Sequence, residues 1–243
     1  MKIYLIGKTE VDLFPHQGDS RHCMPGKAEG SKFQYRVDAD CLSREQWYSE
    51  QTGQELIEFA GRLCYESFNL PSEATKTNSK YVRNIVSQGH ESVLEHVSVT
   101  FYVEGISRNL SHELIRHRHL SFSELSQRFV NMEDANIVDP PARTGNVIPM
   151  PKRYVATYKA VADELTEEGA SRKQAREAAR YSLPQGTETK LVVSGNLRAW
   201  RDVLKKRLSV HADAEIQELT RKIHGILSWE YPDVFADIER DKA

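Results

Sequence analysis

The densest group of side chains that could do chemistry lies between Arg116 and Arg128. This segment holds three arginines, two histidines, a glutamate and three serines. Arginine presents a fixed fork of N–H donors that suits phosphate, and serine hydroxyls can donate to the same oxygens. The segment therefore predicts an anion cradle, in which Glu113 and Glu124 orient the arginines or accept a hydrogen bond from a base or ribose. The alternative is a solvated basic face, the usual form of a charge run; the interleaved serines and the flanking apolar residues favour the cradle.

A strand, a turn and a helix are predicted to carry this segment. Alternation of apolar and polar residues over 97–103 predicts a half-buried strand that ends at Gly105. Apolar residues spaced by four then predict a helix from near Ser107 to about Arg116. Beyond His119 the serines compete with the backbone for hydrogen bonds, so a turn or loop is expected. This order would deliver the arginines to one end of a sheet.

The same segment resembles the signature of a known family. Arg116-His117-Arg118, followed by seven residues and then Ser126, is similar to the Arg-His-Arg-x7-Ser signature of the flavin-dependent thymidylate synthases. The similarity extends to Gln127-Arg128-Phe129 and lies just after a predicted strand, as it does in that family. Further elements spread the resemblance over roughly residues 55–230.

The run from His90 to His96 looks like the family's His-x-Ser-x-x-Glu-His element, in which the serine contacts flavin and the first histidine lies near the ring system. Arg180 falls where the family has an arginine directed at the nucleotide phosphate. For His96 we expect a structural role in the interior of the protein.

Two more elements of the resemblance lie near the C-terminus. Asn196-Leu197-Arg198 looks like the family's element on the flavin, and Arg207 matches the family arginine placed against the pyrimidine ring. Asp202 stands six residues after the asparagine, where some relatives carry a histidine. At this position the chain differs from those relatives, and the difference affects one expected contact with flavin.

The resemblance implies reductive methylation of deoxyuridine monophosphate (dUMP) to thymidine monophosphate (dTMP), a step of dTMP biosynthesis. Methylenetetrahydrofolate would supply the carbon, and FAD would supply the hydride after reduction by NADPH. The resemblance also implies an α+β fold in a single domain, with a mostly antiparallel sheet packed with helices. It further implies a homotetramer whose active sites are shared between subunits.

The resemblance also assigns site residues by position. Arg207 would be the catalytic residue, stabilising negative charge on the ring as N3 loses its proton. Ser126 is expected to bind dUMP and not to act as a nucleophile, because no Ser-His-Asp arrangement is evident. The residues implied to face dUMP are Glu113, Leu114, Ile115, Arg116, Glu124, Leu125, Ser126, Gln127, Arg128, Arg180 and Arg207. Those implied to face FAD are His90, Ser92, Arg116, His117, Arg118, Glu124, Asn196, Leu197 and Arg198.

A cysteine that adds to C6 of uracil is another way to raise the electron density at C5. Cys64 is the only cysteine in the region of the resemblance, and it lies in a predicted apolar helical stripe without an activating neighbour. We therefore expect catalysis without a covalent cysteine.

Composition limits the class of protein. A length of 243 residues suits a single large domain, 1–243. Lysine and arginine number 33 against 35 acidic residues, and this net charge of -2 argues against a general nucleic-acid binder. Cys23, Cys41 and Cys64 form no Cys-x-x-Cys pair, which argues against a disulfide framework or a structural zinc site. No signal-like or membrane-spanning run is evident, so a soluble cytoplasmic protein without a membrane partner is expected.

The rest of the chain is predicted in outline. Stretches rich in proline and glycine at 8–40 and 133–152 are expected to be loops or insertions. Asn196 is expected to cap the helix that follows it. The remaining expected elements are a strand over Lys2–Ile6, a helix with an apolar stripe of Leu56, Phe59, Ala60 and Leu63, helices over Ser79–Ser87, Arg153–Gly169 and Ser171–Leu183, a strand over Leu191–Ser194, a buried stripe of Leu197, Trp200, Leu204 and Leu208, and a last helix over His211–Trp229.

Two other functions remain open from the sequence. One is a nonenzymatic nucleotide- or RNA-binding module built on the arginine segment, which the near-neutral charge and the scattered aromatic residues disfavour. The other is a metal-dependent hydrolase, whose cation the neighbouring arginines would repel; its ligands would be His112, His117 and His119. No metal is expected from residues with other spacings, namely His90 with His96 and the scattered His16, His22 and Cys23.

Overall fold

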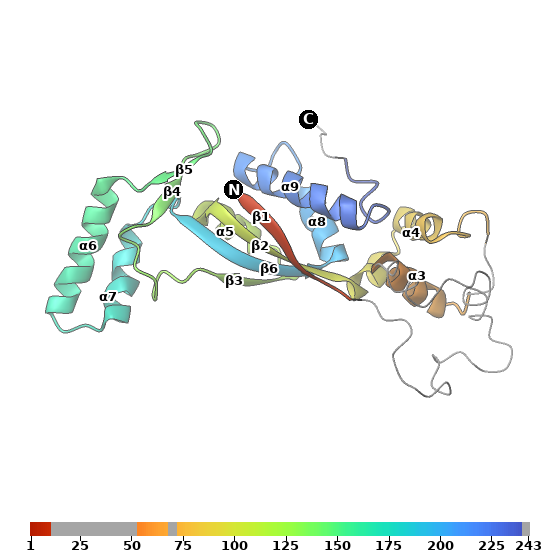
Figure 1. Cartoon of the computed structure of the whole chain (residues 1–243), viewed down its shortest axis with the longest axis horizontal. Coiled ribbons are helices and arrows are strands. Elements are labelled where there is room, and N and C mark those ends of the chain that lie inside the picture. The colour runs from red at the N-terminus through yellow and green to blue at the C-terminus, as the bar shows by residue number, and fades with distance from the viewer. Residues whose placement is uncertain (11–52, 68–71, 240–243) are drawn as a thin grey trace.

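A four-stranded antiparallel sheet forms the centre of the protein (Figure 1). The computed structural model describes residues 1–10, 53–67 and 72–239. The spatial order of the strands is β1-β2-β6-β3. Helices pack around this sheet, so the predicted α+β class is confirmed. The strands are β1 (Lys2–Lys8), β2 (Ser98–Ser107), β3 (Leu120–Glu124) and β6 (Glu188–Asn196).

The predicted strand before the arginine segment is β2. Gly105 does not end it, contrary to the prediction, because the register shifts just before Ile106 and pairing with β6 continues to Ser107. Gly105 has a φ of 70°, which glycine adopts readily, so the extra residue is absorbed in a bulge. As the alternation predicts, one face of β2 is fully buried, at Val99, Phe101 and Val103.

Several helices share one hydrophobic core with the sheet, among them α5 (Arg108–Leu114), α8 (Leu197–Arg207) and α9 (Ala214–Glu230). Trp200 of α8 lies edge-on to Phe101 of β2, with ring centres 5.1 Å apart. Leu208 is only half-buried, and the last helix begins at Ala214, three residues later than predicted. The rest of the stripe predicted for α8 is buried, at Leu197, Trp200 and Leu204.

Both α5 and α8 follow a strand without a loop. Ser107 ends β2 and caps α5 with its side chain, and Asn196 ends β6 and caps α8, as predicted. In the antiparallel pairing Ser98 lies opposite Asn196 and Ser107 lies opposite Glu188. The two helices therefore start at opposite ends of one strand pair, and their C-terminal ends meet over the sheet.

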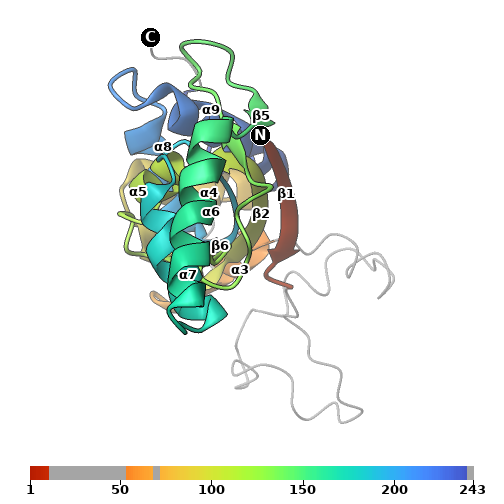
Figure 2. The same cartoon turned by 90° about the vertical axis from the view of Figure 1, so that its left-hand side faces the viewer.

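Two helical pairs lie at opposite ends of the long axis of the molecule (Figure 1). One pair is α3 (Gly53–Leu63) with α4 (Asn78–Ser87), and it is followed by the 3₁₀ helix η1 (Glu91–His96). The other pair, α6 (Lys152–Glu167) and α7 (Arg172–Ala179), lies side by side, as Figure 2 shows from that end of the molecule. A 3₁₀ turn, η2 (Arg180–Ser182), extends α7. The helices predicted over Ser79–Ser87, Arg153–Gly169 and Ser171–Leu183 are confirmed, the last with a tightened final turn.

Stretches predicted to be irregular contain strands. The segment after His119 forms β3, an edge strand paired with β6, and its serines point away from the core without interrupting it. Within 133–152, β4 (Asn136–Val138) and β5 (Val147–Pro149) form a hairpin, with Pro140 and Pro141 in its loop. The predicted strand over Lys2–Ile6 is confirmed and extends to Lys8, whereas β6 is longer than the predicted Leu191–Ser194. From residue 11 onward, the predicted loop over 8–40 lies outside the described residues.

The helix predicted here is confirmed as α3, but the apolar stripe predicted for it is not its buried face. Its apolar members are half-buried or exposed: Leu56, Phe59, Ala60, Leu63 and Cys64. The buried face carries Ile57 and Gly61 together with polar side chains that have partners. Arg62 donates to Glu58 at 2.7 Å, and Gln54 donates to Asp233 at 3.1 Å. Hydrogen-bond partners, some of them from distant parts of the chain, thus offset the cost of burying these polar side chains. The spacing of apolar residues in the sequence cannot reveal such partners.

No helix within the described residues is long and apolar enough to cross a membrane.

Arg201 ties α8 to η1 and to the C-terminal segment. Its side chain is 1% exposed and donates to Glu91 at 3.1 Å, to both carboxylate oxygens of Asp237 at 2.7 Å, and to the backbone carbonyl of Val234. Lys205 also contacts Glu91, at 3.0 Å. Because η1 carries His90 at its start and Ser92 within it, this buried arginine fixes the place of two predicted site residues.

Replacing Arg201 with methionine is expected to lower the free energy of unfolding by about 2–3 kcal/mol. The volume of the side chain is largely kept, but the Val234 carbonyl and the carboxylates of Glu91 and Asp237 lose their donor. Urea unfolding at fixed protein concentration measures this effect. Lys76→Met, which removes an exposed 2.8 Å pair with Glu73, is the matched control and should cost less than about 0.5 kcal/mol. An equal, small effect of both substitutions would contradict the anchoring role.

Candidate active site

The turn after α5 divides the Arg116-His117-Arg118 motif between two environments. The backbone is held on both sides of the histidine: His117 N donates to the Leu114 carbonyl at 3.0 Å, and Leu120 N donates to the His117 carbonyl at 3.2 Å. Arg116 and Arg118 are exposed, whereas the His117 side chain is only 8% exposed. The motif therefore offers two guanidinium groups outward and turns an imidazole inward.

Arg207, the last residue of α8, lies against this turn. Its Nε donates to His117 Nε2 at 3.0 Å, and its Nη1 donates to the Glu113 carboxylate at 2.8 Å. Its Nη2 donates to the Glu113 backbone carbonyl at 3.3 Å. We had expected Glu113 to orient the arginines of the segment 116–128. In the structure it orients Arg207 instead. These contacts use three of the five N–H groups of the guanidinium, so two remain for a ligand.

The His117 ring is held neutral. Burial lowers the pKa of His117 below its usual value, and the positive charge of Arg207 lowers it further. Asp202, with its carboxylate oxygen 3.7 Å from His117 Nδ1, acts to raise this pKa, whereas the positive charge of Lys206 acts to lower it. Since Nε2 accepts from Arg207, it must carry the lone pair, and the ring proton lies on Nδ1.

A first cavity, of about 150 Å³, opens beside these groups. We call it the RHR pocket. Its charged side chains include several cations but a single carboxylate, Asp202, which Lys206 neutralises at 2.7 Å. The pocket is therefore suited to an anion. It is lined by Arg116, His117, Arg118, His119, Leu120, Ala199, Asp202 and Lys206.

A second cavity, of about 350 Å³, lies near the α7 end of the sheet; we call it the Arg180 pocket. Gln127 is 7% exposed, and its Nε2 has no hydrogen-bond partner among the described residues. Such a buried donor favours a ligand that accepts from it. Arg108 adds a second cation and is oriented by Glu124 at 3.1 Å. The lining residues are Arg108, Gln127, Arg180, Tyr181, Leu183, Pro184 and Gln185.

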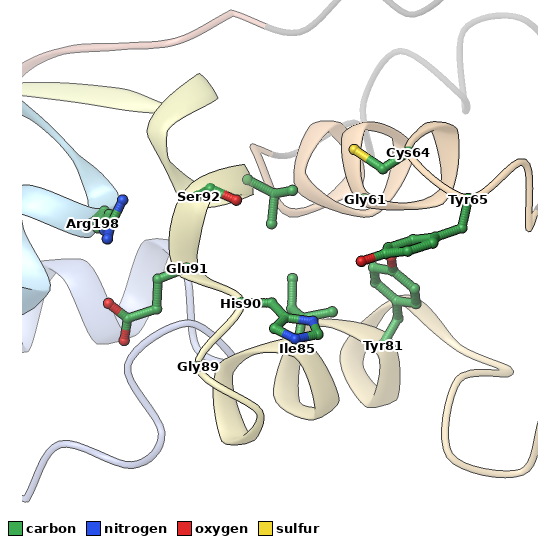
Figure 3. A pocket seen from close by; sticks show the side chains of 11 residues that line it. Gly61, Cys64, Tyr65, Tyr81, Ile85, Gly89, His90, Glu91, Ser92 and Arg198 are labelled. Carbon is green, nitrogen blue, oxygen red and sulfur yellow. The ribbon is translucent and has the colours of Figure 1, made fainter.

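A third cavity, of about 320 Å³, lies between α3, α4 and η1; we call it the His90 pocket. Figure 3 shows the rings of Tyr65 and Tyr81 close to His90, and Arg198 on the far side of Ser92. Burial raises the pKa of the Tyr81 hydroxyl, so that group stays protonated. The lining residues are Gly61, Cys64, Tyr65, Tyr81, Ile85, Gly89, His90, Glu91, Ser92, Val93 and Arg198.

The charged side chains at the edge of the His90 pocket form ion pairs. Burial acts to raise the pKa of Glu91, but Lys205 and Arg201 outweigh it and hold that pKa below its usual value. Arg198 pairs with Glu95 at 2.5 Å, and both side chains are about half exposed. The pocket therefore combines aromatic walls with an ionised rim.

The predicted site residues fall into groups. Arg116, His117 and Arg118 share the RHR pocket, and Arg207 joins them through His117. Gln127 and Arg180 share the second pocket, and His90, Ser92 and Arg198 share the third. One chain thus distributes the predicted flavin residues over two cavities, the RHR pocket and the His90 pocket.

Other predicted residues lie beside these cavities. The side chains of Leu114 and Leu197 are fully buried, so only their backbones could meet a ligand, and Asn196 is engaged as the α8 cap. Ile115 is exposed, whereas Glu124, Leu125 and Ser126 are half-buried at the end of β3. Arg128 lies 3.1 Å from Glu177.

His96 is exposed, so the prediction of an interior position is wrong. The 3₁₀ geometry of η1 buries Val93 and Leu94 and turns His96 outward.

Sequence reasoning missed several lining residues. Arg108 follows the cap of α5 and Lys206 lies in the last turn of α8, and neither residue belongs to a motif. Tyr65 lies in the turn after α3 and Tyr81 lies on α4, and neither segment carried a motif. Cys64 faces a cavity and not the core, because α3 is rotated relative to the prediction. Only the spatial arrangement brings these residues to the predicted ones.

No group of three or more His, Cys, Asp or Glu side chains in the described part of the chain could hold a metal ion. His16, His22 and Cys23 lie outside the described residues.

Comparisons with known proteins agree with the signature. Residues 47–233 match the family described as Thymidylate synthase complementing protein. A flavin-dependent thymidylate synthase of Mycobacteroides abscessus is 46% identical over 200 residues, which cover 77% of this chain and 80% of that protein. One of Mycobacterium marinum is 46% identical over 207 residues, covering 79% and 83%. A crystal structure of Thymidylate Synthase X from Helicobacter pylori with FAD and dUMP is 25% identical with a TM-score of 0.56, covering 76% of this chain and 93% of that one. The matched range 47–233 includes every residue that lines the three cavities.

The neutral state of His117 predicts an acid-sensitive fold. Its pKa is below the usual 6.5 in the folded protein, so between these two values only the unfolded chain binds the proton. His117 therefore lowers the free energy of unfolding as the pH falls from about 6.5 through its folded pKa, and has no such effect above that window. Urea unfolding between about pH 8 and pH 5 should show a steeper acid loss in the wild type than in His117→Gln, which cannot titrate there. Parallel curves would contradict this assignment.

Proposed function

The chain belongs to the thymidylate synthase complementing protein family, and we propose that it is a flavin-dependent thymidylate synthase that methylates dUMP to dTMP with bound FAD. The observation that carries this proposal is the anchored Arg207 guanidinium beside the RHR pocket, in a chain 46% identical to enzymes of that name. Methylenetetrahydrofolate donates the carbon and NADPH supplies the reducing equivalents. The described sheet and helices belong to one catalytic domain that spans residues 1–243.

The chemistry of the side chains suits FAD. A flavin dinucleotide carries a pyrophosphate, and Arg116 and Arg118 supply guanidinium groups to hold it in the RHR pocket. The chain has no Gly-x-Gly-x-x-Gly or Walker loop to bind phosphate by backbone donors, so side chains take that role. The His90 pocket, with Ser92 and Arg198 on its wall, would hold another part of the cofactor. When bound, FAD supplies the hydride that completes the methyl group.

dUMP requires a cation for its phosphate and a polar wall for uracil. Arg180, together with Arg108, offers two guanidinium groups in one cavity, and the unpartnered Gln127 Nε2 offers a further donor. Glu124 is the last residue of β3, and the next four residues implied to face dUMP, Leu125 to Arg128, follow it directly. We assign the Arg180 pocket to the phosphate end of dUMP.

Arg207 is the proposed catalytic residue. Methylation at C5 requires electron density on the ring, which increases when N3 loses its proton. The two N–H groups of Arg207 that Glu113 and His117 leave available would stabilise that charge. Preorganisation by three protein contacts means that the guanidinium need not reorient during the reaction.

The three cavities of one chain favour an active site completed by assembly. The RHR, Arg180 and His90 pockets measure about 150, 350 and 320 Å³ and are lined by separate sets of residues, whereas FAD and dUMP must bind next to each other. We therefore propose a homotetramer in which the RHR, Arg180 and His90 pockets of different subunits combine. Cytoplasmic location is part of the same proposal, in keeping with the free thiol of Cys64.

Replacing Arg207 with alanine is expected to reduce tritium release from C5-labelled dUMP at least about 100-fold, because it removes the charge that stabilises the ring anion. Arg221→Ala is the matched control, since Arg221 is an exposed arginine of α9 bonded to Gln217. Flavin absorbance of the purified variants checks that both retain the cofactor. Full tritium release by the Arg207 variant would refute the ring-polarising role.

Cys64→Ala is expected to keep turnover within about threefold of the wild type, because Cys64 lines a cavity that does not include Arg207 and forms no hydrogen bond or ion pair with a base among the described residues. Steady-state formation of dTMP from dUMP, methylenetetrahydrofolate and NADPH measures this. Complete loss of turnover in a folded, FAD-containing variant would reopen covalent catalysis.

A further inference from the structure

His117 has a contact that its place in the motif does not suggest. Although its neighbours Arg116 and Arg118 are exposed, the His117 ring is buried, and its Nε2 accepts the Arg207 Nε–H at 3.0 Å. The two other contacts of Arg207 go to Glu113, which lies on α5. The histidine therefore provides the contact to the Nε edge of the guanidinium, while Glu113 provides those to its terminal nitrogens.

The groups around the ring select one tautomer. On α8, Asp202 lies 3.7 Å from Nδ1, and Lys206 holds the two Asp202 oxygens at 2.7 and 2.8 Å. A carboxylate on the Nδ1 side favours a proton there, while the guanidinium on the Nε2 side requires a lone pair. The remaining charged or titratable groups near the ring are Glu113 on α5 and Arg116, Arg118 and His119 in the turn.

We propose that His117 is a positioning residue, whose neutral ring with its proton on Nδ1 fixes the Arg207 guanidinium so that the two available N–H groups face the nucleotide ring. The inference deepens the proposed function and rests on the role given there to Arg207. Asp202, which stands where some relatives carry a histidine, serves in this chain to support the required tautomer.

Protonation of His117 would dismantle this arrangement. A second N–H would then face the Arg207 Nε–H, and two cations would lie about 3 Å apart. Arg207 would lose one of its three contacts and could turn away from its position between Glu113 and His117. Affinity for dUMP should therefore fall on acidification beyond the loss caused by titration of the dUMP phosphate itself.

Replacing His117 with glutamine or with asparagine distinguishes a role in positioning Arg207 from a role in packing alone. Glutamine places its side-chain oxygen as many bonds from the backbone as His117 Nε2, so His117→Gln can still accept from Arg207. Asparagine reaches only as far as Nδ1, so His117→Asn cannot. In FAD-loaded protein near pH 8, calorimetry should find dUMP binding within about threefold of the wild type for the glutamine variant and about tenfold weaker for the asparagine variant. The excess acid loss of affinity should disappear in the glutamine variant.

Crystal structures of both variants without dUMP provide a readout that does not depend on activity. Arg207 should keep its contacts with Glu113 and residue 117 in His117→Gln and should lose its fixed orientation in His117→Asn. Flavin content and melting profiles verify that both variants fold.

Different results test the positioning role of His117 and the role of Arg207 on which it rests. If Arg207→Ala weakens dUMP binding but the glutamine and asparagine variants behave alike in affinity and in Arg207 position, the positioning role of His117 is overturned. If Arg207→Ala binds dUMP as tightly as the wild type, the proposed role of Arg207 itself fails, whatever the His117 variants show.

Discussion

The Arg207 guanidinium, held by Glu113 on one side and His117 on the other, is the interaction on which the site depends. It joins the C-terminal end of α8 to the C-terminal end of α5. Both helix ends carry partial negative charge, which stabilises the cations gathered there, including Arg116 and Lys206. The remaining charges of the site are arranged around this junction.

The junction follows from the sheet. Strands β2 and β6 pair antiparallel over about nine residues, and each passes directly into a helix, at Ser107 and Asn196. At about 3.3 Å per residue the pair spans roughly 30 Å, and α5 and α8 at 1.5 Å per residue together cover nearly that length. Their C-terminal ends must therefore meet near the middle of the buried face. The bulge at Gly105 and the two side-chain caps set where each helix begins.

Sequence patterns predicted the local features and the motif, but not the contacts between distant parts of the chain. The Asn196 cap and the buried position of Trp200 depend on neighbouring residues, so spacing reveals them. The orientation of α3 does not depend on neighbouring residues alone. The polar side chains on its buried face find hydrogen-bond partners such as Asp233, about 180 positions away. Likewise, nothing in the motif indicates that His117 turns inward to Arg207, since that contact exists only once two strands have paired.

We propose that a pre-positioned arginine polarises the uracil ring while side-chain cations hold the phosphates of the substrate and cofactor. A crystal structure of the assembled protein with FAD and dUMP tests it most directly. We expect Arg207 N–H groups within about 3 Å of the uracil ring's polar atoms, with Glu113 and His117 still in contact with Arg207 and the nucleotide phosphate against Arg180. A dUMP molecule bound with its ring away from every Arg207 of the assembly would contradict the account.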